Sequence, residues 1–364
     1  MRVLAALSGG VDSAVAAALA VEAGHDVVGV HLALAVGTGS GGCGTTEDAL
    51  DAQRAADALG IECQVWDLSA EFADAVVTDF LAEYAAGRTP NPCVRCNDRM
   101  KFGVLADRAQ AQGFDAVCTG HYARVSVGPD LGHPVVGDDE VVLRRAVHGP
   151  KDQSYVLAVA GPDRLARTLF PLGTLASKDE VRAQAAARGL PVATKHDSLD
   201  LCFVPDGDLR GFLRRRLGSA PGEIVEADGT VVGHHDGTHG FTIGQRRGLA
   251  LGRPAPDGRP RYVLAVEPAA RRVVVGPARA LDVTSFSGTD AVWFGPPAVE
   301  PVPCLVQIRA HATPLPGTVV ATGTGIEVRL STPERGVAPG QSAVCYDDDR
   351  VVVQAAIATT SAGA

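Results

Sequence analysis

A strand signal that runs directly into a glycine turn and then a helix signal opens the chain and most constrains its fold. The apolar run at residues 3–7 is followed by SGGVDS at residues 8–13 and by an alanine-rich stretch at 14–23. Glycine lets the backbone approach an anion, and the N–H groups of a first helical turn face that anion. The segment therefore predicts a phosphate-binding turn. A glycine-rich turn without a ligand is the alternative that these residues leave open, because the Gly-Lys-Ser/Thr of the common P-loop is absent.

Strand-like and helix-like segments alternate up to about residue 120. Apolar runs that indicate strands occupy residues 3–7, 27–34, 61–68 and 116–119, and helical patterns occupy 14–23, 47–59, 70–84 and 99–112. Thr45 with Asp48 fits a capping box, and Gly60 fits a helix stop. This alternation predicts an α/β fold, a doubly wound parallel sheet with helices on both faces. Ligands of such sheets bind at the carboxyl ends of the strands, where residues 8–13, Leu32 and Gly120 would gather.

The second half of the chain differs from the first in composition and in the secondary structure that it predicts. A hairpin is expected from residues 124–127 and 141–145, and after about residue 205 glycine, proline and short β-type runs dominate. The 364 residues allow two or three domains. We predict a catalytic α/β domain at 1–205, a small linking domain at 206–277 and a C-terminal β-barrel at 278–360.

The charge distribution separates the linking domain from the rest. The chain carries a net charge of −9, which by itself disfavours nucleic acid as a partner. Residues 206–277, however, contain 11 arginines against 8 acidic residues and no lysine, with a cluster at Arg214, Arg215 and Arg216. The planar guanidinium suits phosphate, so this block is a candidate nucleic-acid interface. A solvated basic surface is the alternative on charge alone.

Composition indicates a globular protein of the cytoplasm. Hydrophobic residues make up 46% and charged residues 21% of the chain, and no apolar stretch approaches the length of a membrane span. No signal peptide precedes the glycine turn at residue 8. Eight cysteines in such a protein indicate chemistry or metal binding rather than a disulfide framework.

Cys96 is the strongest candidate nucleophile. It lies in NPCVRCN at residues 91–97, just before the helix expected at 99–112, with Asn97 or Asp98 as its cap. A helix N-terminus and nearby cations favour thiolate over thiol. The CxxC pair also fits a redox motif or half of a zinc site, and the chain contains no second CxxC that would complete the zinc site.

The remaining cysteines carry weaker signals. Cys202 has two acidic neighbours and, taken alone, is expected to be a buried structural residue. Cys43, in a glycine-rich stretch, is a minor candidate. The four that lie in apolar or strand-like runs are interpreted as packing residues: Cys63, Cys118, Cys304 and Cys345.

Six motifs in one order resemble a known family. SGGVDS resembles the pyrophosphate loop of the ATP pyrophosphatases, which cleave ATP between the α and β phosphates. The full series resembles the bacterial tRNA-specific 2-thiouridylases over nearly the whole chain: SGGVDS at 8–13, NPCVRCN at 91–97, TGHYA at 119–123, KDQSY at 151–155, DSLDLCF at 197–203 and TIGQRRGL at 242–249. The resemblance implies adenylation of the 2-carbonyl oxygen of the wobble uridine and its replacement by sulfur.

The resemblance also assigns roles to residues. ATP would be held by Ala6, Leu7, Ser8, Gly9, Gly10, Val11, Asp12, Ser13, Leu32 and Gly120. The target base would contact Asn91, Pro92 and Cys93, and the rest of the tRNA would contact Lys151, Asp152, Gln153, Arg309 and Ala310. Cys96 would be the nucleophile and Cys202 the persulfide carrier. Cys96 either attacks the base first or resolves the persulfide by forming a disulfide with Cys202.

Further partners follow from the same resemblance. Mg²⁺ would assist the departure of pyrophosphate, with Asp12 either on the metal side or capping the turn. A cysteine desulfurase or a relay protein would supply the sulfur. The expected working form is a monomer without membrane attachment.

Two departures from the family pattern keep other interpretations open. Position 93 is Cys where many members have Asp, and position 310 is Ala where Tyr is frequent. Three thiolates suit an iron–sulfur cluster, so Cys93, Cys96 and Cys202 together form an alternative cluster site. An amide-forming ATP pyrophosphatase acting on a small metabolite and an RNA-binding module with a degenerate nucleotide site are the rival functions.

Overall fold

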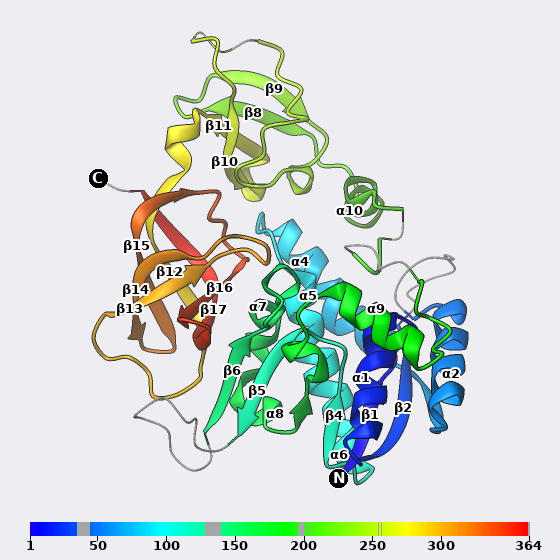
Figure 1. The fold of residues 1–364 in the computed structure, drawn as a ribbon. Helices are drawn as coiled ribbons and strands as arrows, with labels where there is room; N and C mark the ends of the chain where they lie inside the picture. Colours follow the sequence, from blue (N-terminus) through cyan, green and yellow to red (C-terminus); the bar gives the residue numbers. More distant parts are fainter. Residues whose placement is uncertain are drawn as a thin grey trace.

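The N-terminal half of the protein is built on a five-stranded parallel sheet (Figure 1). The computed structural model describes residues 1–34, 44–127, 140–195, 201–204, 206–253, 255 and 257–362. The strand order is β3-β2-β1-β4-β7, and every pairing in it is parallel. The strands are β1 (Arg2–Ala6), β2 (Asp26–Ala33), β3 (Cys63–Asp67), β4 (Ala116–Cys118) and β7 (Thr168–Leu169). The predicted fold class is therefore confirmed.

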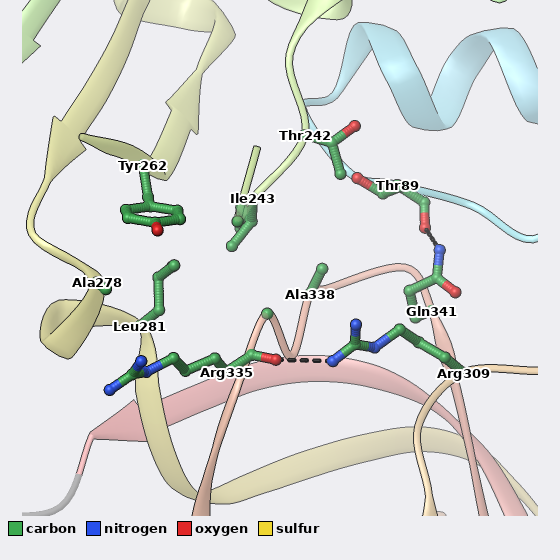
Figure 2. Close-up of a pocket in the computed structure, with 12 residues that line it drawn as sticks. Thr89, Thr242, Ile243, Tyr262, Ala278, Leu281, Arg309, Arg335, Ala338 and Gln341 are labelled. Atoms are coloured by element: carbon green, nitrogen blue, oxygen red, sulfur yellow. Dashed lines mark hydrogen bonds between the residues drawn. The ribbon is translucent and has the colours of Figure 1, made fainter. Parts of the chain in front are cut away.

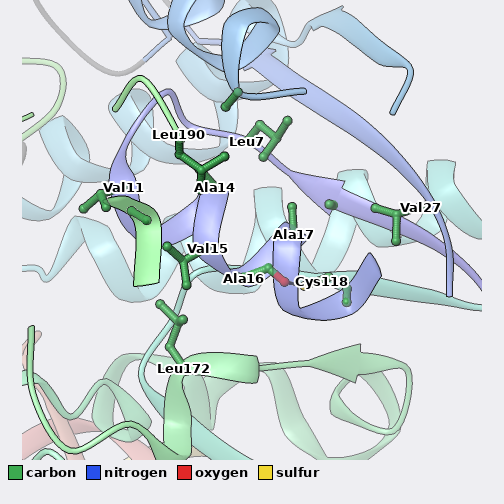
Figure 3. Close-up of a cluster of buried hydrophobic side chains, with 14 of the residues drawn as sticks. Leu7, Val11, Ala14, Val15, Ala16, Ala17, Val27, Cys118, Leu172 and Leu190 are labelled. Carbon is green, nitrogen blue, oxygen red and sulfur yellow. Dashed lines mark hydrogen bonds between the residues drawn. The ribbon is translucent and has the colours of Figure 1, made fainter. Parts of the chain in front are cut away.

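Helices cover both faces of this sheet because successive strand residues point to opposite sides. Val3 and Ala5 pack with α1 (Val11–Glu22), α2 (Thr46–Leu59) and α9 (Lys178–Ala187), in the cluster shown in Figure 3. Leu4 packs on the other face. The helical segments of that face are α3 (Ser69–Phe72), η1 (Ala73–Thr78), α4 (Asp79–Ala85), η2 (Cys96–Val104) and α6 (Leu105–Ala111). The short helix α5 (Pro92–Arg95) leads directly into η2 and packs its Val94 in a different cluster.

Local signals in the sequence identified most of these elements. The capping box of Thr45 and Asp48 is present, and Gly60 ends α2 in the left-handed conformation with φ 67°. The expected start of the helix at residue 99 is wrong. The helical stretch begins at Pro92, because the Asn91 side chain accepts hydrogen bonds from the amides of Cys93 (3.1 Å) and Val94 (3.4 Å). Asparagine before proline is a helix-start signal of its own.

The expected hairpin is present and joins the C-terminal barrel. Strands β5 (Ala123–Val127) and β6 (Val141–Arg145) pair antiparallel, and Arg144 of β6 pairs with Arg350 of β17. Six strands form the barrel, which the β12–β17 pairing closes. They are β12 (Asp282–Trp293), β13 (Val302–Gln307), β14 (Leu315–Thr322), β15 (Gly325–Arg335), β16 (Ser342–Asp347) and β17 (Arg350–Ala362).

A small four-stranded sheet lies apart from the other two sheets, at the top of Figure 1. Its order is β10-β11-β8-β9. The strands are β8 (Gly222–Glu226), β9 (Val231–His235), β10 (Tyr262–Glu267) and β11 (Arg272–Gly276), and α10 (Leu209–Leu217) precedes them. The other short helices are α7 (Ser154–Leu157) and α8 (Gly161–Leu165), and 3₁₀ turns occupy Gly149–Lys151, Ala158–Ala160, Pro171–Thr174, Thr238–Gly240, Pro268–Ala270 and Ala278–Leu281. Among the described residues, no helix has the length and apolar character needed to cross a membrane.

Ionic contacts reinforce the junction between the hairpin and the barrel. The Asp349 carboxylate accepts hydrogen bonds from Arg124 and Arg144. Burial opposes the ionisation of Asp349, but these two arginines outweigh it and hold the pKa of Asp349 below its usual value. The ion pairs therefore stabilise the junction at neutral pH, and this contribution is lost as the pH falls through the lowered pKa.

We expect Asp349→Ala to lower the free energy of unfolding at pH 7 by about 2 kcal/mol, because it removes charge-assisted hydrogen bonds from two arginines. Urea titration measures this. The difference from the parent protein should shrink below about pH 4, where the carboxyl becomes protonated. Glu327→Ala is the control, because Glu327 is exposed and lies 3.5 Å from Arg329. Equal effects of the two substitutions would contradict a special role for the junction.

Candidate active site

The glycine turn after β1 is held in shape by its own serines. The Ser13 hydroxyl accepts from the Ser8 amide at 3.1 Å and donates to the Gly10 carbonyl at 3.0 Å. Gly9 has φ 77°, and a Cβ on it would lie 2.5 Å from the Asp48 carbonyl oxygen. No side chain caps α1 at Gly10. The amides of the first turn of α1 are thus left for an external anion, as in other phosphate-binding turns.

This turn lies where the strand order reverses. From β1 the chain adds β2 and then β3 on one side of β1, and it then crosses to the other side to add β4. Ligands of such sheets bind at the carboxyl ends of the strands where this change of side occurs. The loop after β4 packs closely here, because a Cβ on Gly120 would lie 2.6 Å from the Ser13 amide nitrogen. The structure brings the predicted ATP residues to this edge: Ala6, Leu7, Ser8, Gly9, Gly10, Val11, Asp12, Ser13, Leu32 and Gly120.

Asp12 is engaged by two side chains that the sequence interpretation missed. Both carboxylate oxygens lie 2.7 Å from the Lys178 ammonium, and the Tyr122 hydroxyl donates to one of them at 2.7 Å. Asp12 already accepts three hydrogen bonds in this arrangement, so a magnesium ion on it would have to share the carboxylate with the ammonium and the tyrosine hydroxyl. Lys178 lies 166 residues away in the sequence. In the sequence, the only signal for Lys178 was its position at the start of a helix that Ser177 caps.

Two buried histidines support the same edge. His31 of β2 is 1% exposed, and its Nδ1 donates to the Leu7 carbonyl at 2.9 Å. His121 lies between Thr119, which contacts its Nδ1 at 2.8 Å, and Lys101, whose ammonium contacts its Nε2 at 3.1 Å. Burial and the neighbouring lysine hold the pKa of His121 well below its usual value. Its imidazole is therefore neutral at pH 7, and Nε2 accepts from Lys101.

The two candidate catalytic cysteines pack against one core cluster. Cys96 and Cys202 are half-buried, and both contact the cluster beneath the sheet that contains Met100. Cys96 lies in the second turn of the helical stretch that Asn91 caps, so the expected stabilisation of its thiolate by a helix N-terminus is wrong for Cys96. That position belongs to Cys93, which is exposed. Asp197 and Ser198 of the Cys202 motif lie outside the described residues, as does Cys43.

The packing cysteines behave as expected. Cys304 and Cys345 lie in the barrel core, and Cys118 lies beneath α1. Burial raises the pKa of Cys118 to about 12. Burial, with Asp57 and Glu62 nearby, also raises the pKa of Cys63. Within the described ranges, no group of three or more His, Cys, Asp or Glu side chains is arranged to hold a metal ion.

The predicted tRNA-contact segment 151–153 has mainly internal contacts. The Asp152 side chain is only 5% exposed, and its carboxylate accepts from Arg145 at 3.2 Å and from the Ser154 hydroxyl at 2.8 Å. The Gln153 side chain accepts from the Tyr122 amide at 3.0 Å. This turn therefore connects the loop after β4 with strand β6, and Lys151 at its start is the last residue of the 3₁₀ turn Gly149–Lys151.

A cavity of about 440 Å³ lies between the four-stranded domain, the barrel and the segment around Thr89, and Figure 2 shows the side chains that line it. Arg309 lines it and donates to the Arg335 carbonyl at 2.8 Å. Gln341 donates to the Thr89 carbonyl at 2.7 Å, which ties a barrel loop to the segment just before Asn91. The neighbouring Ala310 contributes its carbonyl to the Gln307 side chain at 2.9 Å.

The arginine cluster at 214–216 forms an exposed face of α10. All three side chains are exposed. Arg215 contacts Asp206 at 3.5 Å, and the Arg216 guanidinium lies 5.7 Å from the centre of the Phe212 ring. Arg246 and Arg247 are also exposed. The basic block predicted from sequence is thus on the surface.

Three family models match the chain in succession. The tRNA methyl transferase HUP domain matches residues 1–206, the tRNA methyl transferase PRC-barrel domain matches 210–277, and the aminomethyltransferase beta-barrel domain matches 283–357. The first of these covers more than half of the chain.

Similar proteins extend over the whole chain. The tRNA-specific 2-thiouridylase MnmA of Beutenbergia cavernae is 58% identical over 370 residues, which cover 99% of this chain and 95% of that protein. The protein of the same name from Acidothermus cellulolyticus is 57% identical, with 99% and 98% covered. The solved structure of the U34-tRNA thiolase NcsA from Methanococcus maripaludis with its 4Fe–4S cluster is 16% identical and covers 60% of this chain and 68% of that chain, with a TM-score of 0.34.

We expect Gly120→Ala to weaken ATP binding about tenfold or more, because the added methyl would force the β4 loop away from the start of α1 and misplace the phosphate-binding turn. Equilibrium binding of a fluorescent ATP analogue measures this. Gly252→Ala is the matched control, because its nearest heavy atom would be 3.8 Å from the new methyl. If both variants bind the analogue like the parent protein, the close approach at Gly120 does not shape the site.

Proposed function

The chain belongs to the family of the tRNA-specific 2-thiouridylases, and from this membership we propose that it replaces the 2-carbonyl oxygen of the wobble uridine in tRNA with sulfur, at the expense of ATP. The observation that carries the proposal is the position of the cysteines. Cys96 and Cys202 pack against the same core cluster, on the sheet whose carboxyl edge carries the phosphate-binding turn. Thiol chemistry beside a nucleotide site is what this reaction requires.

We propose that the three predicted domains have different roles in the reaction. Residues 1–205 would carry out catalysis, 206–277 would bind tRNA through the exposed arginines, and 278–360 would complete the tRNA surface through the barrel. The protein would act in the cytoplasm as a monomer and receive sulfur from a cysteine desulfurase or a relay protein. The net positive charge of 206–277, within a chain of net charge −9, supports the second assignment.

The first chemical step would be adenylation. The uridine O2 attacks the α phosphorus of ATP, the bond to the β-phosphate oxygen breaks, and its electron pair leaves with pyrophosphate. The N3 proton is released to solvent as the C2–N3 double bond forms. The turn at residues 8–13 supports this role, because its glycines and uncapped amides suit a phosphate chain. Mg²⁺ would enter bound to ATP, since Asp12 is engaged by Lys178.

The second step would transfer sulfur. The terminal sulfur of a persulfide on Cys202 attacks C2, and AMP leaves with the electron pair of the C2–O2 bond. The Cys96 thiolate then attacks the Cys202 sulfur. The S–S bond to the substrate breaks, its electron pair stays on the new 2-thio group, and N3 is protonated. The resulting Cys96–Cys202 disulfide is reduced by an external thiol. Dividing the substitution in this way is ordinary covalent catalysis.

Substrate binding would use both the catalytic domain and the barrel. The target uridine would contact Asn91, Pro92 and Cys93 at the start of α5, where Cys93 is exposed. Lys151 would contact a phosphate, and Asp152 and Gln153 would shape the turn that presents it. Arg309 and Ala310 would contact tRNA at the rim of the three-domain cavity. An unpaired wobble base costs only a few kcal/mol to draw into such a pocket, which is about the cost of unstacking it.

Other activities account for fewer of these features. The family-model descriptions mention methyl transfer, whereas full-length relatives with 57–58% identity are named as thiouridylases. An amide-forming pyrophosphatase would have no use for Cys96 and Cys202. A binding module with a degenerate nucleotide site would not need an intact SGGVDS turn. An iron–sulfur cluster on Cys93, Cys96 and Cys202 is not supported, because these three described cysteines do not form a group arranged to hold a metal.

Serine substitution of each cysteine should separate the two steps. We expect Cys202→Ser to release pyrophosphate in the presence of tRNA but to lose 2-thiouridine formation by about a thousandfold or more, because no persulfide can form. Cys96→Ser should accumulate a protein–tRNA adduct that thiols release. Nucleoside mass spectrometry and denaturing gels measure both outcomes.

The control for this experiment is Cys63→Ser, which removes a half-buried thiol whose pKa is raised by burial and acidic neighbours. It should retain the parental rate. Parental thiolation by either Cys96→Ser or Cys202→Ser would refute the assignment of these cysteines.

Neutralising α10 should weaken tRNA binding. With Arg214, Arg215 and Arg216 changed to Gln, we expect the slope of log K against log salt to become shallower by about 2, because fewer phosphate counterions are released. Filter binding at several salt concentrations measures this. Arg329→Gln, on the exposed side of β15, is the control. An unchanged slope in the triple variant would remove α10 from the tRNA interface.

A further inference from the structure

The ion pair at the start of α1 joins three separate segments. Lys178 is the first residue of α9, and its ammonium lies 2.7 Å from both oxygens of Asp12, the second residue of α1. The Tyr122 hydroxyl, from the loop after β4, donates to the same carboxylate. The Ser177 hydroxyl fixes the start of α9 by accepting from the Glu180 amide at 3.1 Å. The ammonium is therefore held beside the glycine turn by the fold itself.

Helix stability does not explain a lysine at this position. The N-terminus of a helix carries a partial positive charge, so a cation in the first turn is unfavourable. Lys178 begins α9 and contacts the first turn of α1, and its side chain is only 14% exposed. Glu180, in the same turn, serves α9 itself by accepting from the Ala176 amide at 2.8 Å. Two helix N-termini and an ammonium thus meet at a place where Asp12 supplies the compensating carboxylate.

Such a concentration of positive charge complements a polyphosphate. ATP carries several negative charges on its phosphate chain, and the charge on the leaving pyrophosphate grows as the bond to the α phosphorus breaks. A fixed cation beside that chain stabilises the transition state more than the ground state. Asp12 already uses two 2.7 Å contacts to hold the ammonium, so a metal ion on Asp12 would have to compete with Lys178 for the same carboxylate.

We propose that Lys178 is the cation that this protein supplies to the phosphates of ATP, and that Asp12 and Tyr122 position it. On ATP binding the ammonium shares its hydrogen-bond donors between Asp12 and the β- and γ-phosphate oxygens. Lys178 then stabilises the departing pyrophosphate in the adenylation step described above. The inference rests on the proposed function for that step, but the affinity of the site for ATP depends only on the charge arrangement.

The test compares Lys178→Met and Lys178→Arg with Arg188→Met. Arg188 forms the corresponding ion pair at the far end of the same two helices, where its side chain contacts both oxygens of Glu22 at 2.7 Å. Removing that pair loosens α9 from α1 without touching the glycine turn. All three proteins are assayed for tRNA-dependent pyrophosphate release and, by calorimetry, for binding of α,β-methylene ATP.

We expect Lys178→Met to bind α,β-methylene ATP about tenfold more weakly and to lose about a hundredfold in kcat for pyrophosphate release. Lys178→Arg should recover part of both losses, and Arg188→Met should match the parent. Unchanged binding of α,β-methylene ATP by Lys178→Met would overturn the proposal, as would equal losses in Arg188→Met. A parent protein that binds the analogue through Lys178 but never releases pyrophosphate would instead refute the thiouridylase activity.

A magnesium titration distinguishes the role of Asp12. If Asp12 positions Lys178, Asp12→Asn should lower the rate of pyrophosphate release without changing the Mg²⁺ concentration that gives half of the maximal rate. A tenfold increase in that concentration for Asp12→Asn, with none for Lys178→Met, would assign Asp12 to the metal and overturn the proposal.

Discussion

At the carboxyl edge of the parallel sheet, two glycines lie so close to neighbouring backbone that no side chain would fit at either position. A Cβ on Gly9 would collide with α2, and a Cβ on Gly120 would collide with the start of α1. These contacts bring the turn after β1 and the loop after β4 together at the point where the strand order reverses. Every other part of the site is arranged around this edge, including the engaged Asp12 and the buried His31 that anchors Leu7.

The barrel contributes to the candidate active site through the segment that precedes Asn91. Gln341 donates to the Thr89 carbonyl, and the Thr89 amide donates to the Pro339 carbonyl at 3.1 Å. Asn91 then caps the helical stretch that carries Cys93 and Cys96. The barrel thus fixes the entry of this stretch, and the position of the cysteines depends on residues more than two hundred positions away in the chain.

Patterns among neighbouring residues in the sequence predicted the structural features that depend on neighbouring residues. The parallel strands, the capping box at Thr45 and the hairpin followed from periodicity and cap chemistry, because neighbouring residues determine them. The predicted start of the Cys96 helix is wrong because Asn97 and Asp98 are also possible caps, whereas the structure uses Asn91. The contact of Lys178 with Asp12 joins segments 166 residues apart, and no periodicity encodes such a contact. Likewise, nothing in β6 alone specifies its pairing with β17.

That shared strand pairing has a mechanical consequence. The hairpin β5–β6 belongs to the sheet of the barrel through the pairing of Arg144 with Arg350, so the hairpin cannot turn against the barrel without breaking that pairing and the Asp349 contacts. The four-stranded domain has a separate core and no strand pairing with either neighbour among the described residues. The four-stranded domain is therefore the part that can change its position without breaking strand pairing among the described residues, whereas the hairpin and the barrel must move together.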